Sequence, residues 1–280
     1  MLRQIDLCSG IGAGFPLAGI ITGEIKLCGL CESDEFCCHR LSDHLRWAPM
    51  CHRFPGVTIY PDVKELWIKP NYADLITSSP PCQPFTVEGK RLGSTDKRDC
   101  IPAVLRIVRI AQPKFFCLEN VPGLLSAPII PGAESGSYFQ QMLKELWSSG
   151  YNAQWIVIGT QQFGSLWSGE RLLLIATSRS LKLEWERTTP WNDQIGSQSQ
   201  ETGNSSEEGS IQSRMVGSSV RITNRMDRPP GVPSGNGIVR ARRAALGNIL
   251  DPRIAAIPLS GVGKAIAIKR ILYLNSLCFS

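Results

Sequence analysis

The sequence is poor in histidine. Its 280 residues include three histidines, His39, His44 and His52, and none lies beside the segments that carry its most distinctive motifs. A cysteine protease requires a histidine base next to its nucleophile, so this shortage argues against that class of enzyme. The sequence also has no internal repeat.

Long apolar runs are missing too. No uncharged apolar run reaches the ~18 residues that a membrane span requires. The amino-terminal M-L-R-Q-I-D lacks the charged-then-apolar order of a secretory signal. We therefore expect a cytosolic protein without a membrane partner.

Cysteine, by contrast, is plentiful, with ten residues. In a chain of this length without a secretory signal, they favour reduced thiols over a disulfide framework. The C-x-x-C pair Cys28 and Cys31 raises the alternative of a metal site, but it falls within the strand-like run I-K-L-C-G-L-C-E, whereas zinc ligands usually occupy turns. Buried thiols without a metal are the expectation.

Positive charge is concentrated in one segment. Between Arg214 and Arg243 there are seven arginines against one acid, Asp227, which gives a local net charge of +6, equal to that of the whole chain. Such a segment favours a polyanionic partner, although a solvated arginine-rich loop has the same charge pattern.

The first 180 residues alternate between two kinds of segment. Short apolar runs predict buried strands, and two stretches with helical spacing predict helices at 102–111 and 137–147. The expected strands are 3–8, 25–31, 73–78, 114–119, 154–159 and 171–177. This alternation predicts a Rossmann-like, doubly wound α/β sheet.

The residues after 180 divide into a short basic region and a carboxyl-terminal segment that is expected to pack on the first domain. Residues 181–243 form a small, irregular basic region, within which the polar stretch 192–213 predicts a mobile loop. Residues 244–280 predict a loop and a returning helix that completes the domain of residues 1–180.

A glycine-rich turn follows the first strand. The strand ends at Asp6 and runs into C-S-G-I-G-A-G, in which Gly10 and Gly12 let the backbone approach a ligand closely. The next strand ends at Glu32, 20 residues beyond Gly12, where an acid can bond ribose hydroxyls. A tight turn alone would explain the glycines, but together with both acids they favour a nucleoside-bearing cofactor.

A cysteine and an acid lie at the ends of two later strands. Cys82 follows the strand A-D-L-I-T-S inside P-P-C-Q-P-F, and Glu119 ends the strand K-F-F-C-L-E. Ligands of open α/β sheets gather at this edge, so both side chains could act on one substrate. For Cys82 the residues alone leave three interpretations open: a nucleophile, a metal ligand, or a buried apolar side chain.

These segments occur together in one family. In order, D-L-C-S-G-I-G-A-G, C-E-S-D, P-P-C-Q-P-F, D-K-R, F-F-C-L-E-N-V-P-G-L-L and G-T-Q-Q-F-G resemble the blocks of DNA (cytosine-5)-methyltransferases. The resemblance covers residues 3 to about 177 and resumes at A-L-G-N, residues 245–248. It implies the family's fold, a sheet that binds S-adenosylmethionine, with residues 181–243 as the target-recognition region.

The resemblance also implies roles for individual residues. Cys82 would add to carbon 6 of a cytosine flipped out of duplex DNA, while Glu119 holds a proton against ring nitrogen 3. Asn120 would orient the pocket, and loop 83–98 would close over the base. The remaining implied site residues are Arg171 on the base side, with Asp62 and Asn248 on the cofactor side.

The chain departs from the family in its eighth block. The family pattern P-Q-x-R-x-R corresponds here to L-W-S-G-E-R, so Leu166, Trp167 and Gly169 replace family residues and Arg171 alone survives. The implied activity is cytosine methylation of double-stranded DNA by a monomer of bacterial or phage origin, with a cognate restriction endonuclease as candidate partner. A decayed, DNA-binding relative and an RNA cytosine methyltransferase are the alternatives.

Overall fold

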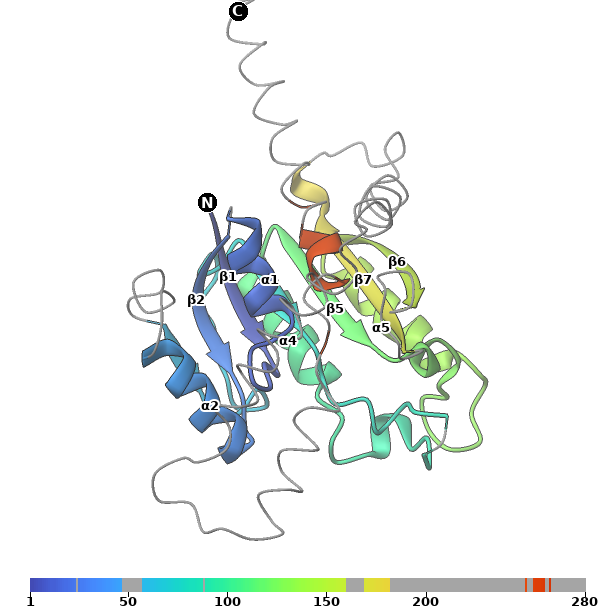
Figure 1. Cartoon of the computed structure of the whole chain (residues 1–280). Helices are drawn as coiled ribbons and strands as arrows, with labels where there is room; N and C mark the ends of the chain where they lie inside the picture. The colour runs from blue at the N-terminus through green and yellow to red at the C-terminus, as the bar shows by residue number, and fades with distance from the viewer. Residues whose placement is uncertain are drawn as a thin grey trace, which may run out of the picture.

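The computed structural model describes residues 1–23, 25–46, 57–87, 89–159, 169–181, 250, 254–259 and 262. In these residues seven strands form one sheet in the order β3-β2-β1-β4-β5-β7-β6 (Figure 1). The strands are β1 Leu2–Leu7, β2 Ile25–Cys31, β3 Thr58–Tyr60, β4 Leu75–Ser78, β5 Phe115–Asn120, β6 Tyr151–Gly159 and β7 Glu170–Ser178.

The sheet is mixed. Strands β1 to β5 pair in parallel, whereas β7 is antiparallel to both of its neighbours, β5 and β6. The carboxyl ends of β1, β2, β4 and β5 therefore meet at the same edge as the amino-terminal end of β7. Because of this reversal, Arg171 lies at the edge where Glu119 ends its strand.

Helices cover both faces of the sheet. The longer helices are α1 Phe15–Thr22, α2 Glu35–Arg46, α4 Ile101–Ala111 and α5 Ser137–Ser148, and η1 Gly93–Thr95, η2 Pro122–Ser126 and η4 Arg179–Leu181 are single 3-10 turns. Alternate residues of β5 point to opposite faces: Phe116 packs in one core with α4 and α5, and Phe115 packs in another with α1 and residues 254–259.

The expected doubly wound α/β sheet is confirmed. Each of the six expected strands and both expected helices is present, with ends that coincide or are shifted by at most three residues. Helices α1 and α2 and the short strand β3 were not predicted. The basic region lies outside the described residues, apart from Leu181 at its start, as does all of the loop 192–213.

Only part of the expected carboxyl-terminal return is described. Residues 254–259 are helical, and Ile254 and Ile257 are buried against the face of the sheet that α1 covers. In the described part of the chain, no helix is both long and apolar enough to cross a membrane.

Candidate active site

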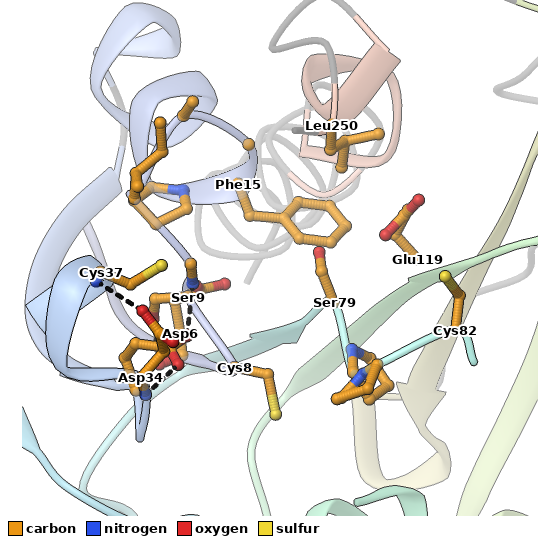
Figure 2. Close-up of a pocket in the computed structure, with 18 of the residues that line it drawn as sticks. Asp6, Cys8, Ser9, Phe15, Asp34, Cys37, Ser79, Cys82, Glu119 and Leu250 are labelled. Carbon is orange, nitrogen blue, oxygen red and sulfur yellow. Dashed lines mark hydrogen bonds between the residues drawn. The ribbon is translucent and has the colours of Figure 1, made fainter. Parts of the chain in front are cut away.

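A cavity of about 320 Å³ opens at the carboxyl edge of the parallel strands. Its wall combines the loop after β1, the residues after β2, the turn after β4 and the end of β5 (Figure 2). Phe15 of α1 and Leu250 add apolar surface from the side of the second core. The topology thus collects polar side chains from segments far apart in the sequence into one cavity.

The glycine-rich turn forms one end of this cavity. Gly10 and Gly12 have φ angles of +54° and +79°, in the left-handed region that side chains disfavour. A Cβ atom on Gly12 would lie 2.9 Å from Cδ2 of Leu41, so the Leu41 side chain on helix α2 would have to shift to admit one. Gly10 lines the cavity, whereas Gly12 shapes the turn without being among the lining residues.

Glu32 ties the glycine-rich turn to the end of β2. Its carboxylate accepts the backbone N–H of Gly10 at 2.6 Å and those of Ser33 and Asp34 at 2.8 Å each. Asp34 also lines the cavity, and its side chain accepts the N–H of Cys37 in the first turn of α2. Asp34 was not predicted as a site residue, although it follows Glu32 closely in the block C-E-S-D.

Asp6 lies at the base of the same end and is 2% exposed. Thr77 on β4 donates its hydroxyl hydrogen to the Asp6 carboxylate at 2.5 Å. Burial raises the pKa of Asp6 to about 7, although the hydrogen bonds from Thr77 and Ser9 act in the opposite direction. Near neutral pH this carboxyl can therefore gain or lose a proton.

Cys82 is half-buried at the other end of the cavity. The backbone carbonyl of Cys82 accepts the N–H groups of Phe85 and Thr86 at 2.9 and 3.0 Å. Cys82 is therefore the first residue of a turn that backbone hydrogen bonds hold in place. Burial raises the pKa of the Cys82 thiol and the neighbouring Glu119 raises it further, while Arg171 and Arg98 lower it. The resting group is therefore a thiol, and the two arginines favour its ionised form.

Glu119 forms an ion pair with Arg171. The Arg171 Nε lies 3.1 Å from the Glu119 Oε1, and the pair joins β5 to the antiparallel β7. Burial raises the pKa of Glu119 to about 7, against the opposing effects of Arg171 and the Ser79 hydroxyl. A carboxyl in this state can hold a proton at neutral pH and donate it to a bound group.

Asn120 acts behind the cavity wall. Its buried side chain donates to the carbonyl of Pro80 at 3.1 Å and accepts the N–H of Val121 at 2.9 Å. These two bonds fix the proline turn that carries Cys82 relative to the end of β5. Asn120 is not itself a lining residue.

Loop 83–98 packs against the segment that follows β5. Arg91 donates to the carbonyl of Gly123 at 3.2 Å and to the hydroxyl of Ser126 at 2.8 Å, and Ser94 donates to the carbonyl of Ile129. Gln83 is the one residue of this loop among the cavity's lining residues. In the described conformation the loop therefore lies beside the cavity.

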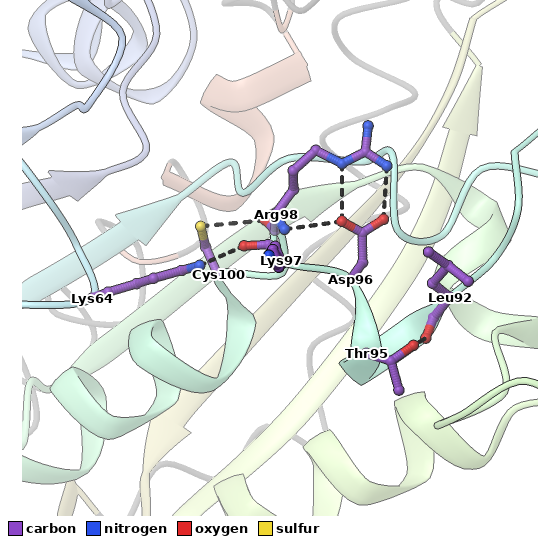
Figure 3. Close-up of polar contacts among 7 residues, drawn as sticks. All are labelled: Lys64, Leu92, Thr95, Asp96, Lys97, Arg98 and Cys100. Atoms are coloured by element: carbon purple, nitrogen blue, oxygen red, sulfur yellow. Dashed lines mark hydrogen bonds and ion pairs between the residues drawn. The ribbon is translucent and has the colours of Figure 1, made fainter.

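Arg98, at the end of this loop, has a fixed orientation. Its Nε and Nη2 donate to the two carboxylate oxygens of Asp96 at 2.9 and 2.7 Å (Figure 3). Such a two-point contact holds the guanidinium in one plane. Arg98 is thereby kept as one of the two cations that lower the pKa of Cys82.

The two remaining residues expected on the cofactor side are Asp62 and Asn248. Asp62 is not among the lining residues, and its carboxylate accepts the N–H of Lys64 at 2.8 Å. Asn248 lies outside the described residues, as do Leu166 and Trp167 of the divergent block. From the carboxyl-terminal segment, the described residue that lines the cavity is Leu250.

The C-x-x-C pair faces the protein interior. Cys28 donates its S–H to the carbonyl of Gln4, and Cys31 is 1% exposed. Burial raises the pKa of Cys28 to about 11 and that of Cys31 to about 12, so both thiols stay protonated near neutral pH. Among the described residues there is no group of three or more side chains arranged to hold a metal ion.

Comparison with known proteins gives one family. The model of the family described as "C-5 cytosine-specific DNA methylase" matches residues 2–227. Among curated relatives, Type II methyltransferase M.BsuFI of Bacillus subtilis is 39% identical over 103 residues, which is 36% of this chain and 24% of that protein. Type II methyltransferase M.AquIA of Picosynechococcus is 34% identical over 129 residues, which is 44% of this chain and 50% of that protein.

A solved structure adds information on the fold alone. The crystal structure of S. pombe Dnmt2 methyltransferase aligns with a TM-score of 0.57 at 14% identity, covering 95% of this chain and 99% of that one. The matches to the two curated relatives span half or less of their lengths.

Proposed function

The chain belongs to the C-5 cytosine-specific DNA methylase family, and from this premise we propose that it transfers a methyl group from S-adenosylmethionine to carbon 5 of cytosine in duplex DNA. The observation that carries the proposal is one cavity with two chemically different ends. Cys82, Glu119 and Arg171 lie at one end, and Asp6, Glu32 and the glycine-rich turn lie at the other.

The second end fits the proposed cofactor. Gly10 brings its backbone to the cavity and Gly12 shapes the turn behind it, both at positive φ angles that side chains disfavour. The carboxylates of Asp6, Glu32 and Asp34 give this end a negative potential, which suits a ligand with hydroxyl groups and a sulfonium cation. S-adenosylmethionine, when bound, supplies an electrophilic methyl group.

At the first end, Cys82 is the proposed nucleophile. Carbon 5 of cytosine becomes nucleophilic only after a group adds to carbon 6, and the Cys82 thiolate would form that bond. Arg171 and Arg98 both lower the pKa of the Cys82 thiol and so favour the thiolate. After methylation, loss of the carbon 5 proton and departure of the thiolate restore the aromatic ring and the free enzyme.

Glu119 is proposed to handle the proton on the ring. With a pKa of about 7 its carboxyl is partly protonated at neutral pH and can give a proton to ring nitrogen 3 as Cys82 adds to carbon 6. The resulting carboxylate is then paired with Arg171 at 3.1 Å. Arg171 thus stabilises the form of Glu119 that the addition step generates.

Carbon 6 is shielded inside a duplex, so the target base must leave the base stack. Loop 83–98 carries Arg98 and begins beside Cys82, and we propose that it closes over the extruded base. The arginines between Arg214 and Arg243 would contact phosphates and base edges, which predicts binding that weakens steeply with salt.

The proposal is tested by bisulfite sequencing of DNA from a methylation-free bacterial host that expresses this chain. We expect methylated cytosines in one short sequence context for the wild type and none for Cys82→Ser. Cys28→Ser is the matched control, because a serine hydroxyl there can still donate to the carbonyl of Gln4.

An equal mark in wild type and Cys82→Ser would refute the nucleophile. No mark in any variant, with folded protein in each case, would refute the proposed activity for this chain. Methyl transfer in vitro to transfer RNA in preference to duplex DNA would establish the RNA alternative.

A further inference from the structure

Three polar side chains interrupt the apolar layer between the sheet and helix α1. Gln4 and Asp6 lie two residues apart on β1, and Thr77 lies opposite Asp6 on β4. They are 0%, 2% and 0% exposed. The same layer is otherwise built of apolar side chains such as Phe15 and Leu75. A core position normally favours an apolar residue, so a buried polar group of this kind requires matched hydrogen bonds.

The three side chains form a hydrogen-bonded chain that leads to the cavity. The Gln4 Nε2 donates to the Thr77 Oγ1 at 2.8 Å, and the Thr77 hydroxyl donates to the Asp6 Oδ1 at 2.5 Å. Asp6 is the one member of the three that lines the cavity. The two side chains behind it therefore have no route to a ligand except through Asp6.

Gln4 has an unused acceptor at the far end of this chain. Its Oε1 is buried and has no hydrogen-bond partner among the described residues. A Cβ atom on Gly19 of α1 would lie 2.5 Å from this oxygen, so the glycine makes room for the amide. The amide thus occupies a space that α1 leaves open.

These groups can match Asp6 in both of its protonation states. When Asp6 is ionised, the amide and the hydroxyl both donate toward the carboxylate, as described. When Asp6 is protonated, its O–H can donate to Thr77, whose hydroxyl then donates to the Gln4 Oε1 after the amide turns by half a rotation. A hydroxyl and an amide each supply a donor and an acceptor. The hydrogen bonds between Gln4, Thr77 and Asp6 can therefore reverse their donor–acceptor direction while the Asp6 carboxyl keeps a hydrogen-bond partner.

We infer that Gln4 and Thr77 are positioning residues that let Asp6 exchange a proton, and that binding of cationic S-adenosylmethionine drives that proton off. The inference rests on the proposed function, because it concerns the cofactor end of the same cavity. The pKa of Asp6, raised by burial to about 7, places the exchange near neutral pH. A cation in the cavity stabilises the carboxylate and so lowers this pKa.

Few other groups near Asp6 could account for a proton released there. At the end of β2, Glu32 raises the pKa of Asp6, and Cys31 stays a thiol near neutral pH. Helix α1 contains no titratable side chain, and β4 contributes the hydroxyl of Thr77. Glu119 titrates near the same pH at the other end of the cavity and has to be removed from the measurement.

The test is calorimetric titration of the full chain, carrying Glu119→Gln, with S-adenosylmethionine between pH 6 and 8.5. Repeating each titration in buffers of different ionisation enthalpy gives the number of protons released. With a pKa of about 7 for Asp6, we expect release of about half a proton at pH 7 and close to one at pH 6. Asp6→Asn should abolish the release.

Thr77→Val separates the positioning role from a purely structural one. Losing the donated hydroxyl raises the pKa of Asp6, so the pH midpoint of binding should move upward and more proton should be released at pH 7. Thr77→Ser keeps a hydroxyl and should restore the midpoint. A structural role alone would weaken binding in Thr77→Val while leaving the midpoint in place.

The outcomes distinguish this inference from the proposed function. An unchanged midpoint in Thr77→Val, or release that persists in Asp6→Asn, would overturn the inference while leaving cofactor binding established. Absence of S-adenosylmethionine binding at every pH would overturn both.

Discussion

Replacing Glu119 with glutamine should change how the stability of the protein depends on pH. Glu119 is 9% exposed, and its pKa is raised from 4.5 to about 7 mainly by burial. The shift is a property of the folded state, since an unfolded chain leaves the carboxyl in water. Glutamine has nearly the same shape and does not titrate, so it isolates the effect of this single proton.

The sign of the effect follows from proton linkage. Between pH 4.5 and 7 the folded protein keeps the Glu119 proton that the unfolded chain has lost. Its contribution to stability is therefore greatest below pH 4.5, falls as the pH rises, and is lost once the pH passes about 7. A rise in the Glu119 pKa from 4.5 to about 7, at about 1.4 kcal/mol for each tenfold change in proton affinity, corresponds to about 3 kcal/mol.

The assay is urea denaturation of wild type and Glu119→Gln at several pH values from 4.5 to 8. We expect the stability of the variant relative to wild type to rise by about 3 kcal/mol across this range, while other titrating groups cancel in the difference. Glu134→Gln, at an exposed acid outside the cavity lining, is the control and should show no such trend. A flat difference for Glu119→Gln would refute the assignment of a buried, protonated carboxyl.

Two further substitutions test the surroundings of the site. Arg171→Ala removes a cation that lowers the pKa of Glu119. In the same urea assay, the fall in stability between pH 4.5 and 8 should therefore extend to higher pH. An unchanged pH profile would contradict the role of the ion pair. Gly93→Ala places a Cβ atom against the carbonyl of Pro128 at a φ of +55° and should lower the free energy of unfolding by about 2 kcal/mol or more. Gly132→Ala is the control, because Gly132 has a φ of +85° with open space around it, and its free energy of unfolding should fall by about 1 kcal/mol. Equal losses for the two variants in urea denaturation would show that loop 83–98 does not pack closely at Gly93.

Most of the predicted strands could be found because their sequences are continuous apolar runs that are buried on both faces of the sheet. Strand β6, expected to be buried, lies at the edge of the sheet and is partly exposed, with Trp155 at 45%. Helix α1, F-P-L-A-G-I-I-T, could not be predicted, because it is apolar on nearly all sides and shows no polar face that would mark helical spacing. Strand β3 has three residues, too few for a period of two to be recognised. The direction of β7 is also absent from the sequence pattern, since alternation is the same in parallel and antiparallel strands.

The candidate site could be predicted wherever a residue ends a parallel strand. Asp6, Cys82 and Glu119 fall at one edge for that reason, and their proposed roles stay predictions until tested. The ion pair between Glu119 and Arg171 depends on the antiparallel pairing of β7, which strand patterns do not encode. Thr77 was hidden inside a strand, where a threonine usually indicates no more than strand propensity.

The antiparallel direction of β7 also separates the sequence into a part that precedes Ser178 and a part that follows it. Strand β7 carries the chain from Arg171, beside the cavity, to Ser178 at the opposite edge of the sheet, about 23 Å away at about 3.3 Å per residue. By that point the chain has already supplied Cys82, Glu119 and Arg171, and among the residues described after Ser178 it is Leu250 that lines the cavity. Cleavage of the chain after Ser178 would therefore leave Cys82, Glu119 and Arg171 on one fragment and the apolar lining residue Leu250 on the other.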